Sequence, residues 1–167
     1  KISVIAAPNF EWNHEKSFNK KLGYTHLESP NTIAGYYNAT TSLTEKRNKN
    51  NDFTTQILAN YTKSFGKHDV NVLVGYENYH YKYDNTSGSG DRFELTSFPY
   101  LDLAPSDYQS VTGNAQEYAY RSFFGRINYA YANKYLLEAN VRRDGSSRFS
   151  KDNRWATFPS VSAGWVL

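Results

Sequence analysis

Apolar and polar residues alternate with a period of two along much of this chain, most regularly from residue 121 to residue 167. Successive side chains on a β-strand point to opposite faces, so an alternating segment divides into two sets of residues. In the segment that starts at Tyr135, one set is apolar and the other largely polar. These sets are Tyr135, Leu137, Ala139 and Val141, and Leu136, Glu138, Asn140 and Arg142. The pattern predicts neighbouring antiparallel strands with one apolar, aromatic face and one polar face.

The same alternation predicts about six strands in all. A tight turn at 66–69 and a short turn at 132–134 join two pairs of them, and the other connections are longer. The expected strands span residues 1–13, 39–65, 69–83, 118–131, 134–144 and 156–167, with loops at 14–38, 84–117 and 145–155. Two irregularities are expected, because Pro8 cannot donate to a strand ladder and the alternation inverts after Glu77. Either a bulge follows Glu77, or the strand leaves at that point the apolar surroundings that impose the alternation.

An alternating all-β chain has two physical interpretations. In a soluble sandwich the apolar face is the core, whereas in an outer-membrane barrel it faces lipid and the polar face lines a wet lumen. Tyr129, Tyr131 and Tyr135 flank the turn at 132–134, and short connections alternate with long ones. Both features favour the barrel, because aromatic residues gather at membrane interfaces. The residues expected to face lipid are Ile127, Tyr129, Tyr135, Leu137, Ala139, Val141, Val161 and Trp165.

The string FFGRINYAYANKYLLEANVRRDGSSRF, followed by NRWATFPSVSAGW, resembles the barrel of the SusC/RagA family of TonB-dependent outer-membrane transporters. The resemblance is close over residues 118–167 and fainter over residues 52–83. It implies that these antiparallel strands form part of a large transmembrane β-barrel, of about 22 strands with a plugged lumen. It also implies the outer membrane of a Gram-negative bacterium, with the long loops outside the cell.

The function that the resemblance implies is uptake of oligosaccharides or peptides across the outer membrane. The implied partners are the remainder of the same barrel, a SusD-like surface lipoprotein that caps it, and the TonB complex. TonB would act through a plug domain that these 167 residues do not contain. Outer-membrane lipid would surround the apolar face. The alternatives are a soluble all-β carbohydrate-binding module, or an adhesin or enzyme barrel of the outer membrane.

Length and composition indicate an internal piece of a larger protein. The chain has no Met and no recognisable signal peptide, and six strands are too few to close a barrel, which needs about eight. Aromatic residues make up 17% of the chain, yet the mean hydropathy is −0.74 and no apolar run is long enough for a transmembrane helix. The absence of cysteine excludes disulfides and thiolate chemistry. The net charge of +3 is mixed along the chain and predicts no nucleic-acid partner.

No residue pattern predicts catalysis, a cofactor or a metal site. The four histidines lack ligand spacing, the carboxylates are scattered, and no nucleophile elbow or phosphate loop is present. The oxygen-rich segments 84–91 and 144–147 lack the full ligand series of a calcium loop, so turns are expected there. Residues 142–149 are expected to pack a tight loop against the barrel wall, with charged side chains bonded to neighbouring strands. The chain is therefore expected not to be an enzyme.

Tyrosines in and beside the longest loop are the candidate ligand contacts. Their rings can stack on sugars or grip a peptide; the alternative is that they fill the loop's own small core or an interfacial belt. The candidate substrate-binding residues are Tyr79, Tyr81, Tyr83, Tyr100 and Tyr108. The loop at 84–117 also carries enough apolar surface to fold against another part of the chain, which is typical of functional loops.

Overall fold

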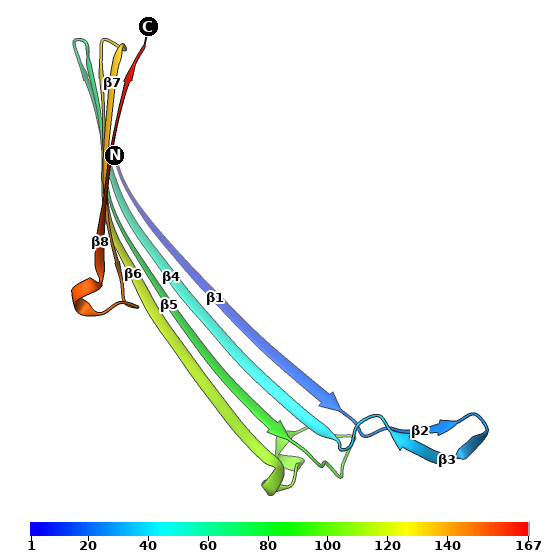
Figure 1. Cartoon of the computed structure of the whole chain (residues 1–167). Helices are drawn as coiled ribbons and strands as arrows, with labels where there is room; N and C mark the ends of the chain where they lie inside the picture. Colours follow the sequence, from blue (N-terminus) through cyan, green and yellow to red (C-terminus); the bar gives the residue numbers. More distant parts are fainter. Residues whose placement is uncertain (167) are drawn as a thin grey trace. The chain divides into compact units, whose positions relative to one another are not determined.

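The computed structural model describes residues 1–166, so Leu167, the end of the predicted strand 156–167, lies outside the described residues. Six strands form one antiparallel sheet in the order β1-β4-β5-β6-β7-β8, and β2 and β3 form a separate hairpin (Figure 1). The strands are β1 (Ile2–Asn19), β2 (Gly23–His26), β3 (Ser29–Tyr36), β4 (Ser42–Phe65), β5 (His68–Gly90), β6 (Gln109–Tyr131), β7 (Tyr135–Ser146) and β8 (Trp155–Trp165). Short 3-10 helices are η1 (Leu101–Leu103), η2 (Ser106–Tyr108) and η3 (Lys151–Asn153). Across residues 1–166, no helix is long and apolar enough to cross a membrane.

Several strands extend beyond the limits that the alternation predicted. β1 continues to Asn19, β5 continues to Gly90 and β6 begins at Gln109. The expected loops at 14–38 and 84–117 are therefore shorter than predicted. The ladder is built from backbone hydrogen bonds, so polar residues continue it as well as apolar ones. Alternation is imposed only where one face is apolar, which is why the sequence pattern missed these strand ends.

The predicted loop at 14–38 also contains the hairpin of β2 and β3. Gly23 pairs with Tyr36 and Tyr24 pairs with Gly35, and the register then shifts twice towards the turn. Gly35 lies within the segment predicted to be a loop, and a Cβ built there would lie 2.6 Å from the hydroxyl oxygen of Tyr24. The glycine is needed because the tyrosine ring covers it, an arrangement that occurs within strands.

The chain divides into two compact units. Unit 1 comprises Lys1–Phe10, Asn51–Lys82 and the chain from Gln116 onward, and unit 2 comprises Glu11–Asn50 and Tyr83–Ala115. Strands β1, β4, β5 and β6 contribute residues to both units.

The buried hydrophobic residues of the described chain all belong to unit 2. Leu43, on β4, is fully buried and packs with Phe93 and Ala104 from the connection between β5 and β6, flanked by Phe18 and Leu101. Gly90 lies beneath this contact, since a Cβ built there would be 2.7 Å from that of Ala104. The apolar content of the long loop therefore packs against β1 and β4.

In unit 1, strand register places the predicted lipid-facing residues on one face. Ile127 pairs with Ala139, Ala139 pairs with Val161, and Tyr135 pairs with Trp165. Val161 is 74% exposed, and within unit 1 no second sheet covers this face. The arrangement is that of a single-layer wall and not of a soluble sandwich, whose inner faces cover each other.

The two short turns of unit 1 lie at one end of its sheet, together with the end of β8, and the β7–β8 connection with η3 lies at the other end (Figure 1). Gly66, in the β4–β5 turn, has a φ of +60°, which favours glycine. In the β6–β7 turn, Ala132 and Asn133 have φ values of 54° and 53°, and the amide of Lys134 donates to the carbonyl of Tyr131 at 3.0 Å. Positive φ at both central residues matches the twist of a tight hairpin.

Candidate functional site

A row of aromatic rings crosses the apolar face of unit 1 beside the short turns. His68 stacks on Phe65 with 5.1 Å between ring centroids, and Tyr131 lies 5.0 Å from His68 on its other side. The Tyr129 hydroxyl and Nδ1 of His68 are 2.7 Å apart and hydrogen-bonded. At the next strand pair, Nζ of Lys134 lies 5.8 Å from the Trp165 ring.

A second aromatic row crosses the same face further along the strands. The ring of Phe123 lies 5.2 Å from that of Tyr76 and 6.0 Å from that of Trp155. The guanidinium carbon of Arg143 lies 5.5 Å from the Trp155 ring centroid. Each row thus joins aromatic rings to a cation, a combination suited to a boundary between hydrocarbon and water.

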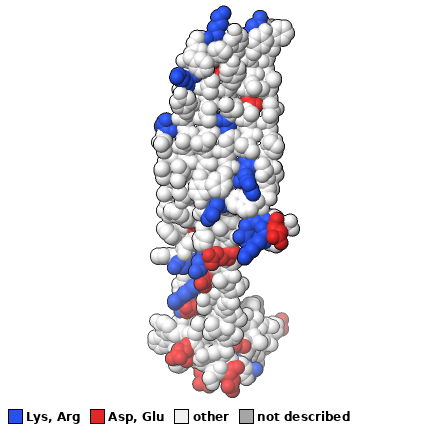
Figure 2. All heavy atoms as spheres, turned by 90° about the vertical axis from the view of Figure 1, so that its left-hand side faces the viewer, with Lys and Arg blue, Asp and Glu red and all other residues white. Residues whose placement is uncertain are grey.

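The band between the two rows is apolar on this face except for Lys63, which lies next to the first row on β4. Its other residues are Ile57, Ala59, Tyr61, Val70, Val72, Val74, Gly125, Ile127, Leu137, Ala139, Val141, Pro159, Val161 and Ala163. His68 and Tyr76, which mark the rows on β5, are eight positions apart, a separation of about 27 Å along the strand. With the tilt of barrel strands this spans roughly 20 Å, close to the apolar band of about 25 Å in outer-membrane barrels. In Figure 2, uncharged residues make up most of the surface over the strands that end at the short turns.

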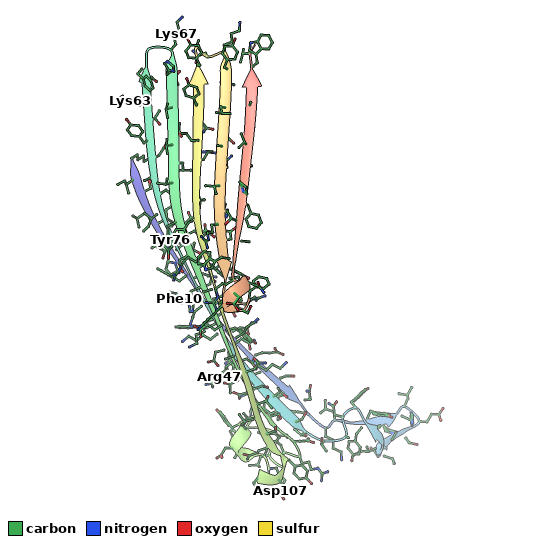
Figure 3. The ribbon with its side chains drawn as sticks, turned by 60° about the vertical axis from the view of Figure 1, so that its left-hand side comes forward. Phe10, Arg47, Lys63, Lys67, Tyr76 and Asp107 are labelled. Carbon is green, nitrogen blue, oxygen red and sulfur yellow. The ribbon has the colours of Figure 1, made fainter. Side chains whose placement is uncertain are left out.

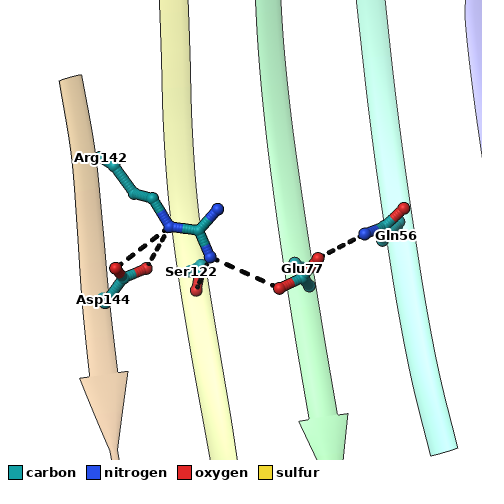
Figure 4. A network of polar contacts seen from close by, with 5 residues as sticks. All are labelled: Gln56, Glu77, Ser122, Arg142 and Asp144. Atoms are coloured by element: carbon teal, nitrogen blue, oxygen red, sulfur yellow. Dashed lines mark hydrogen bonds and ion pairs between the residues drawn. The ribbon is translucent and has the colours of Figure 1, made fainter. Parts of the chain in front are cut away.

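The opposite face of unit 1 carries a charged network centred on Arg142 (Figure 4). Its Nε donates to both carboxylate oxygens of Asp144, at 2.8 and 3.1 Å, and its terminal nitrogen donates to the hydroxyl of Ser122 at 3.0 Å. The same nitrogen lies 3.5 Å from the carboxylate of Glu77, which also accepts a hydrogen bond from Gln56. The network ties β7 to β6, β5 and β4, so the predicted bonding of the 142–149 segment to neighbouring strands is present.

A concave site of about 770 Å³ adjoins this network. Arg142 and Glu77 line it together with aromatic side chains and Arg154 from the end of the β7–β8 connection. The aromatic side chains are Tyr79, Tyr120, Phe149 and Phe158. Because Glu77 and Tyr79 line the same hollow, they lie on one face. The side chains of β5 therefore continue to alternate between the two faces of the sheet beyond Glu77, and Tyr79 extends the polar face.

Four tyrosines and one arginine form a cluster on this face, which we call the tyrosine platform: Tyr79, Tyr81, Tyr118, Tyr120 and Arg148. Ring centroids are 6.0 Å apart for Tyr79 and Tyr120 and 4.7 Å apart for Tyr81 and Tyr118. The guanidinium carbon of Arg148 lies 4.0 Å from the Tyr118 ring centroid. Neighbouring rings and a cation on a sheet surface can stack on a ring-shaped or planar ligand.

The structure brings together two of the five predicted substrate-binding residues, Tyr79 and Tyr81. Tyr83 instead hydrogen-bonds through its hydroxyl to Asn48 at 3.3 Å in unit 2. Also in unit 2, the ring of Tyr100 lies 5.1 Å from Nζ of Lys16, and that of Tyr108 lies 4.1 Å from the guanidinium carbon of Arg92.

Sequence reasoning missed Tyr118, Tyr120 and Arg148 as members of the platform. The signal was present, because Tyr118 and Tyr120 repeat the two-residue spacing of Tyr79 and Tyr81. It becomes informative once β5 and β6 are known to be neighbours in the sheet. The register that sets those rings side by side is a tertiary property.

A single-layer antiparallel sheet, with one apolar face banded by aromatic rows and one polar face, defines the wall of a transmembrane β-barrel. The chain belongs to the TonB-dependent receptor family: the family described as TonB dependent receptor-like, beta-barrel, matches residues 5–167. The predicted fold class, part of a transmembrane barrel that these strands alone do not close, is thereby confirmed, as is the resemblance to SusC and RagA.

Curated relatives and solved structures agree with this assignment. The TonB-dependent receptor SusC of Bacteroides thetaiotaomicron is 38% identical over 111 residues, which are 66% of this chain and 11% of that protein. The TonB-dependent receptor P39 of Formosa agariphila is 30% identical over 99% of this chain and 16% of that protein. The structure of the RagAB peptide transporter matches with a TM-score of 0.83 and 25% identity, over 97% of this chain and 17% of that one. The chain thus spans about a sixth or less of the length of these relatives.

Proposed function

We propose that this chain forms part of the barrel wall and rim of a SusC-type importer that takes up oligosaccharides or peptides across the outer membrane. The apolar face meets lipid, the polar face lines the wet lumen, and the β7–β8 connection with the long β5–β6 connection lies outside the cell. The remainder of the barrel closes the wall, a SusD-like lipoprotein caps it, and TonB supplies energy through a plug domain. The chain's role is transport and not catalysis.

The observation that carries this proposal is the predominantly apolar band between two aromatic rows on one face of unit 1. A water-soluble single-layer sheet would leave that band against water, at a cost of roughly 25 cal/mol for each square ångström of apolar surface. Hydrocarbon removes that cost. The matches to SusC and to the RagAB peptide transporter support import as the activity.

Site-specific labelling tests the placement of the two faces. The chain contains no cysteine, so single cysteines can be introduced into it in the complete protein, on a background without other accessible cysteines. We expect a fluorophore at Leu137→Cys to be quenched by brominated lipid and one at Asn140→Cys, on the opposite face, to be quenched much less. Equal quenching at both positions would contradict a lipid-facing apolar surface.

Labelling of intact cells tests which connections lie outside. A membrane-impermeant maleimide should label Lys151→Cys, in η3, on intact cells. It should label Lys134→Cys, in the β6–β7 turn, only after the outer membrane has been permeabilised. The opposite result would reverse the proposed orientation.

The tyrosine platform is the proposed substrate contact of this segment, together with the tyrosines at 83, 100 and 108 that the sequence predicted. Growth of a deletion strain, complemented with the complete gene, on single oligosaccharides or peptides identifies a substrate. Uptake of that substrate should then fall several-fold in Tyr81→Ala/Tyr118→Ala, because stacking contributes about 1 kcal/mol per ring. Tyr81→Phe/Tyr118→Phe, which keeps the rings, should retain most uptake. Unchanged uptake in the alanine variant, at equal barrel abundance, would remove the platform from the transport path.

A further inference from the structure

The concave site beside the Arg142 network, on the polar face of unit 1, contains a cation that its own carboxylates do not neutralise. We call this site the Arg154 hollow and define it by Glu77, Tyr79, Tyr120, Phe149, Arg154 and Phe158. Its volume of about 770 Å³ lies in the range of small-ligand sites, about 300–1,000 Å³. Phe149 and Arg154 come from the β7–β8 connection, which Figure 3 shows in orange at the end of the unit 1 sheet opposite the turn of Lys67.

The Arg154 guanidinium is the uncommitted charge of this hollow. Within residues 1–166, its Nε is buried without a hydrogen-bond partner. The two carboxylates that line the hollow, those of Glu77 and Asp144, both pair with Arg142 instead. A buried donor without a partner costs free energy, and an acceptor on a ligand removes that cost. The hollow therefore favours a ligand with a negatively charged oxygen.

The backbone of Arg154 is held against the end of β7. Its carbonyl accepts a hydrogen bond from the amide of Ser146 at 3.1 Å. A guanidinium on a fixed backbone loses less freedom when it binds, and its planar fork matches the two oxygens of a carboxylate with parallel hydrogen bonds. Among negatively charged groups, a carboxylate is thus a good geometric match.

Two phenylalanines give the hollow an apolar part on a largely polar face. Phe158 pairs with Arg142 in the strand register, and both Phe149 and Phe158 line the hollow. They are 61% and 57% exposed, and neither ring carries a polar atom. An apolar side chain can cover these rings without leaving a hydroxyl unpaired, whereas a sugar ring there would bury hydroxyls against them. A carboxylate next to an apolar side chain is the chemistry of the last residue of a peptide.

We propose that the Arg154 hollow binds the C-terminal residue of an imported peptide, with its carboxylate on Arg154 and its apolar side chain against Phe149 and Phe158. Tyr79 and Tyr120 line the hollow and also belong to the tyrosine platform, with ring centroids 6.0 Å apart. The preceding residues of the peptide therefore extend over the platform. The site rests on the proposed function and selects peptides from the two substrate classes named there.

Binding of two pools of fluorescent tetrapeptides to the complete detergent-solubilised protein tests this proposal. Both pools end in apolar residues, and they differ only in carrying a free C-terminal carboxylate or an amide. We expect the free acids to bind about 10- to 100-fold more tightly, the gain that hydrogen bonds to a charged group provide. Arg154→Gln should remove this preference and leave binding of the amides unchanged. Arg154→Lys, which keeps the charge, should retain part of it.

The matched control is Arg126→Gln, which removes an exposed arginine from the polar face of β6 outside the hollow and should keep the preference for free acids. Phe149→Ser/Phe158→Ser should weaken binding of both pools, because each loses its apolar contact. Equal binding of the two pools to the wild type, or equal loss of preference in Arg154→Gln and Arg126→Gln, would overturn the proposal.

A fluorescent uronic-acid tetrasaccharide is the third probe, because it carries carboxylates on sugar rings. If it binds in a manner abolished by Arg154→Gln while neither peptide pool binds, the hollow takes acidic sugars and the assignment to peptides is wrong. The contrast in lipid quenching between Leu137→Cys and Asn140→Cys tests the orientation of the two faces without any ligand. A protein that keeps this contrast but does not prefer free acids would disprove the site alone and leave the import proposal standing.

Discussion

Arg142 and Asp144, two positions apart on β7, are joined by a pair of hydrogen bonds from Nε to the two carboxylate oxygens. Residues at this spacing share a face of a strand, so the ion pair lies along β7 while the other end of the guanidinium reaches Ser122 on β6 and Glu77 on β5. One arginine therefore holds two carboxylates and a buried hydroxyl, since Ser122 is 4% exposed.

Replacement of Arg142 by alanine should lower the free energy of unfolding by about 1–2 kcal/mol. Glu77, Asp144 and the Ser122 hydroxyl lose a shared donor, but the side chain of Arg142 is 45% exposed and water replaces part of the loss. Urea unfolding of the complete barrel in lipid measures the change. Arg142→Lys should recover part of it, whereas Lys151→Ala, in exposed η3, should be neutral. An Arg142→Ala barrel as stable as the wild type would show that the network is not structural.

Arginine substitutions at Ala139 and Asn140 should have very different effects. Ala139 lies between Ile127 and Val161 in the strand register, whereas Asn140 lies between Arg126 and Ser160 on the polar face. Ala139→Arg should destabilise the barrel by about 2–4 kcal/mol if the residue sits at the bilayer midplane, and Asn140→Arg should cost little. Folding stabilities measured in lipid vesicles decide this, and the reverse order would refute the assignment of faces.

The alternation in the sequence predicted the wall of unit 1 well for a physical reason. One apolar face imposes a strict period of two, so Leu137, Ala139 and Val141 could be assigned to a single face before any pairing was known. The two aromatic rows could be predicted only in part from the sequence. Tyr129, Tyr131 and Tyr135 surround a recognisable turn, but His68 joins them through register alone.

Unit 2 was harder to predict because no apolar face governs its strands. Its ladders use polar residues, so β1 beyond residue 13 and the β2–β3 hairpin resemble loops in sequence. The run of serine and glycine before Gly90 lies in the segment 84–91, for which the sequence predicts a turn. It is paired strand, and Gly90 makes room for Ala104 to pack above it. Close backbone approach of this kind depends on the partner, which the sequence does not identify.

Alanine at Gly75 should destabilise unit 1, because a Cβ there would overlap the ring of Phe124 on the neighbouring strand. The expected cost is about 1–3 kcal/mol, typical of an overpacked contact. Gly164→Ala is the matched control, since its nearest neighbour would be Cβ of Leu136 at 3.6 Å, an ordinary contact. Urea unfolding should show a clear loss only for Gly75→Ala. Combining it with Phe124→Leu should restore part of the loss; if it does not, the ring is not the obstacle.

The ion pair between Lys16 and Glu45 should make the stability of unit 2 depend on acid pH. The Lys16 ammonium, 2.7 Å away, is the main cause that holds the pKa of the Glu45 carboxyl below its ordinary value of 4.5, and His14 adds to it. Because the pKa of Glu45 is lower in the folded state, the folded state binds fewer protons than the unfolded state at pH values between the lowered pKa and 4.5. The stabilisation is therefore present above pH 4.5 and is lost as pH falls through the lowered pKa.

Lys16→Gln should move the pKa of Glu45 back towards 4.5 and remove about 0.5–1 kcal/mol of stability at neutral pH, the range of a partly exposed pair. Wild type and variant should converge in strongly acidic solution, where Glu45 is protonated in both. Unfolding curves of the complete protein between pH 7 and pH 3 measure the difference. Lys46→Gln, which removes a cation 4.0 Å from Glu15, is the control and should leave the acid dependence unchanged. A difference between Lys16→Gln and wild type that stays constant over this pH range would show that Lys16 acts through packing on Tyr100 and not through the carboxylate.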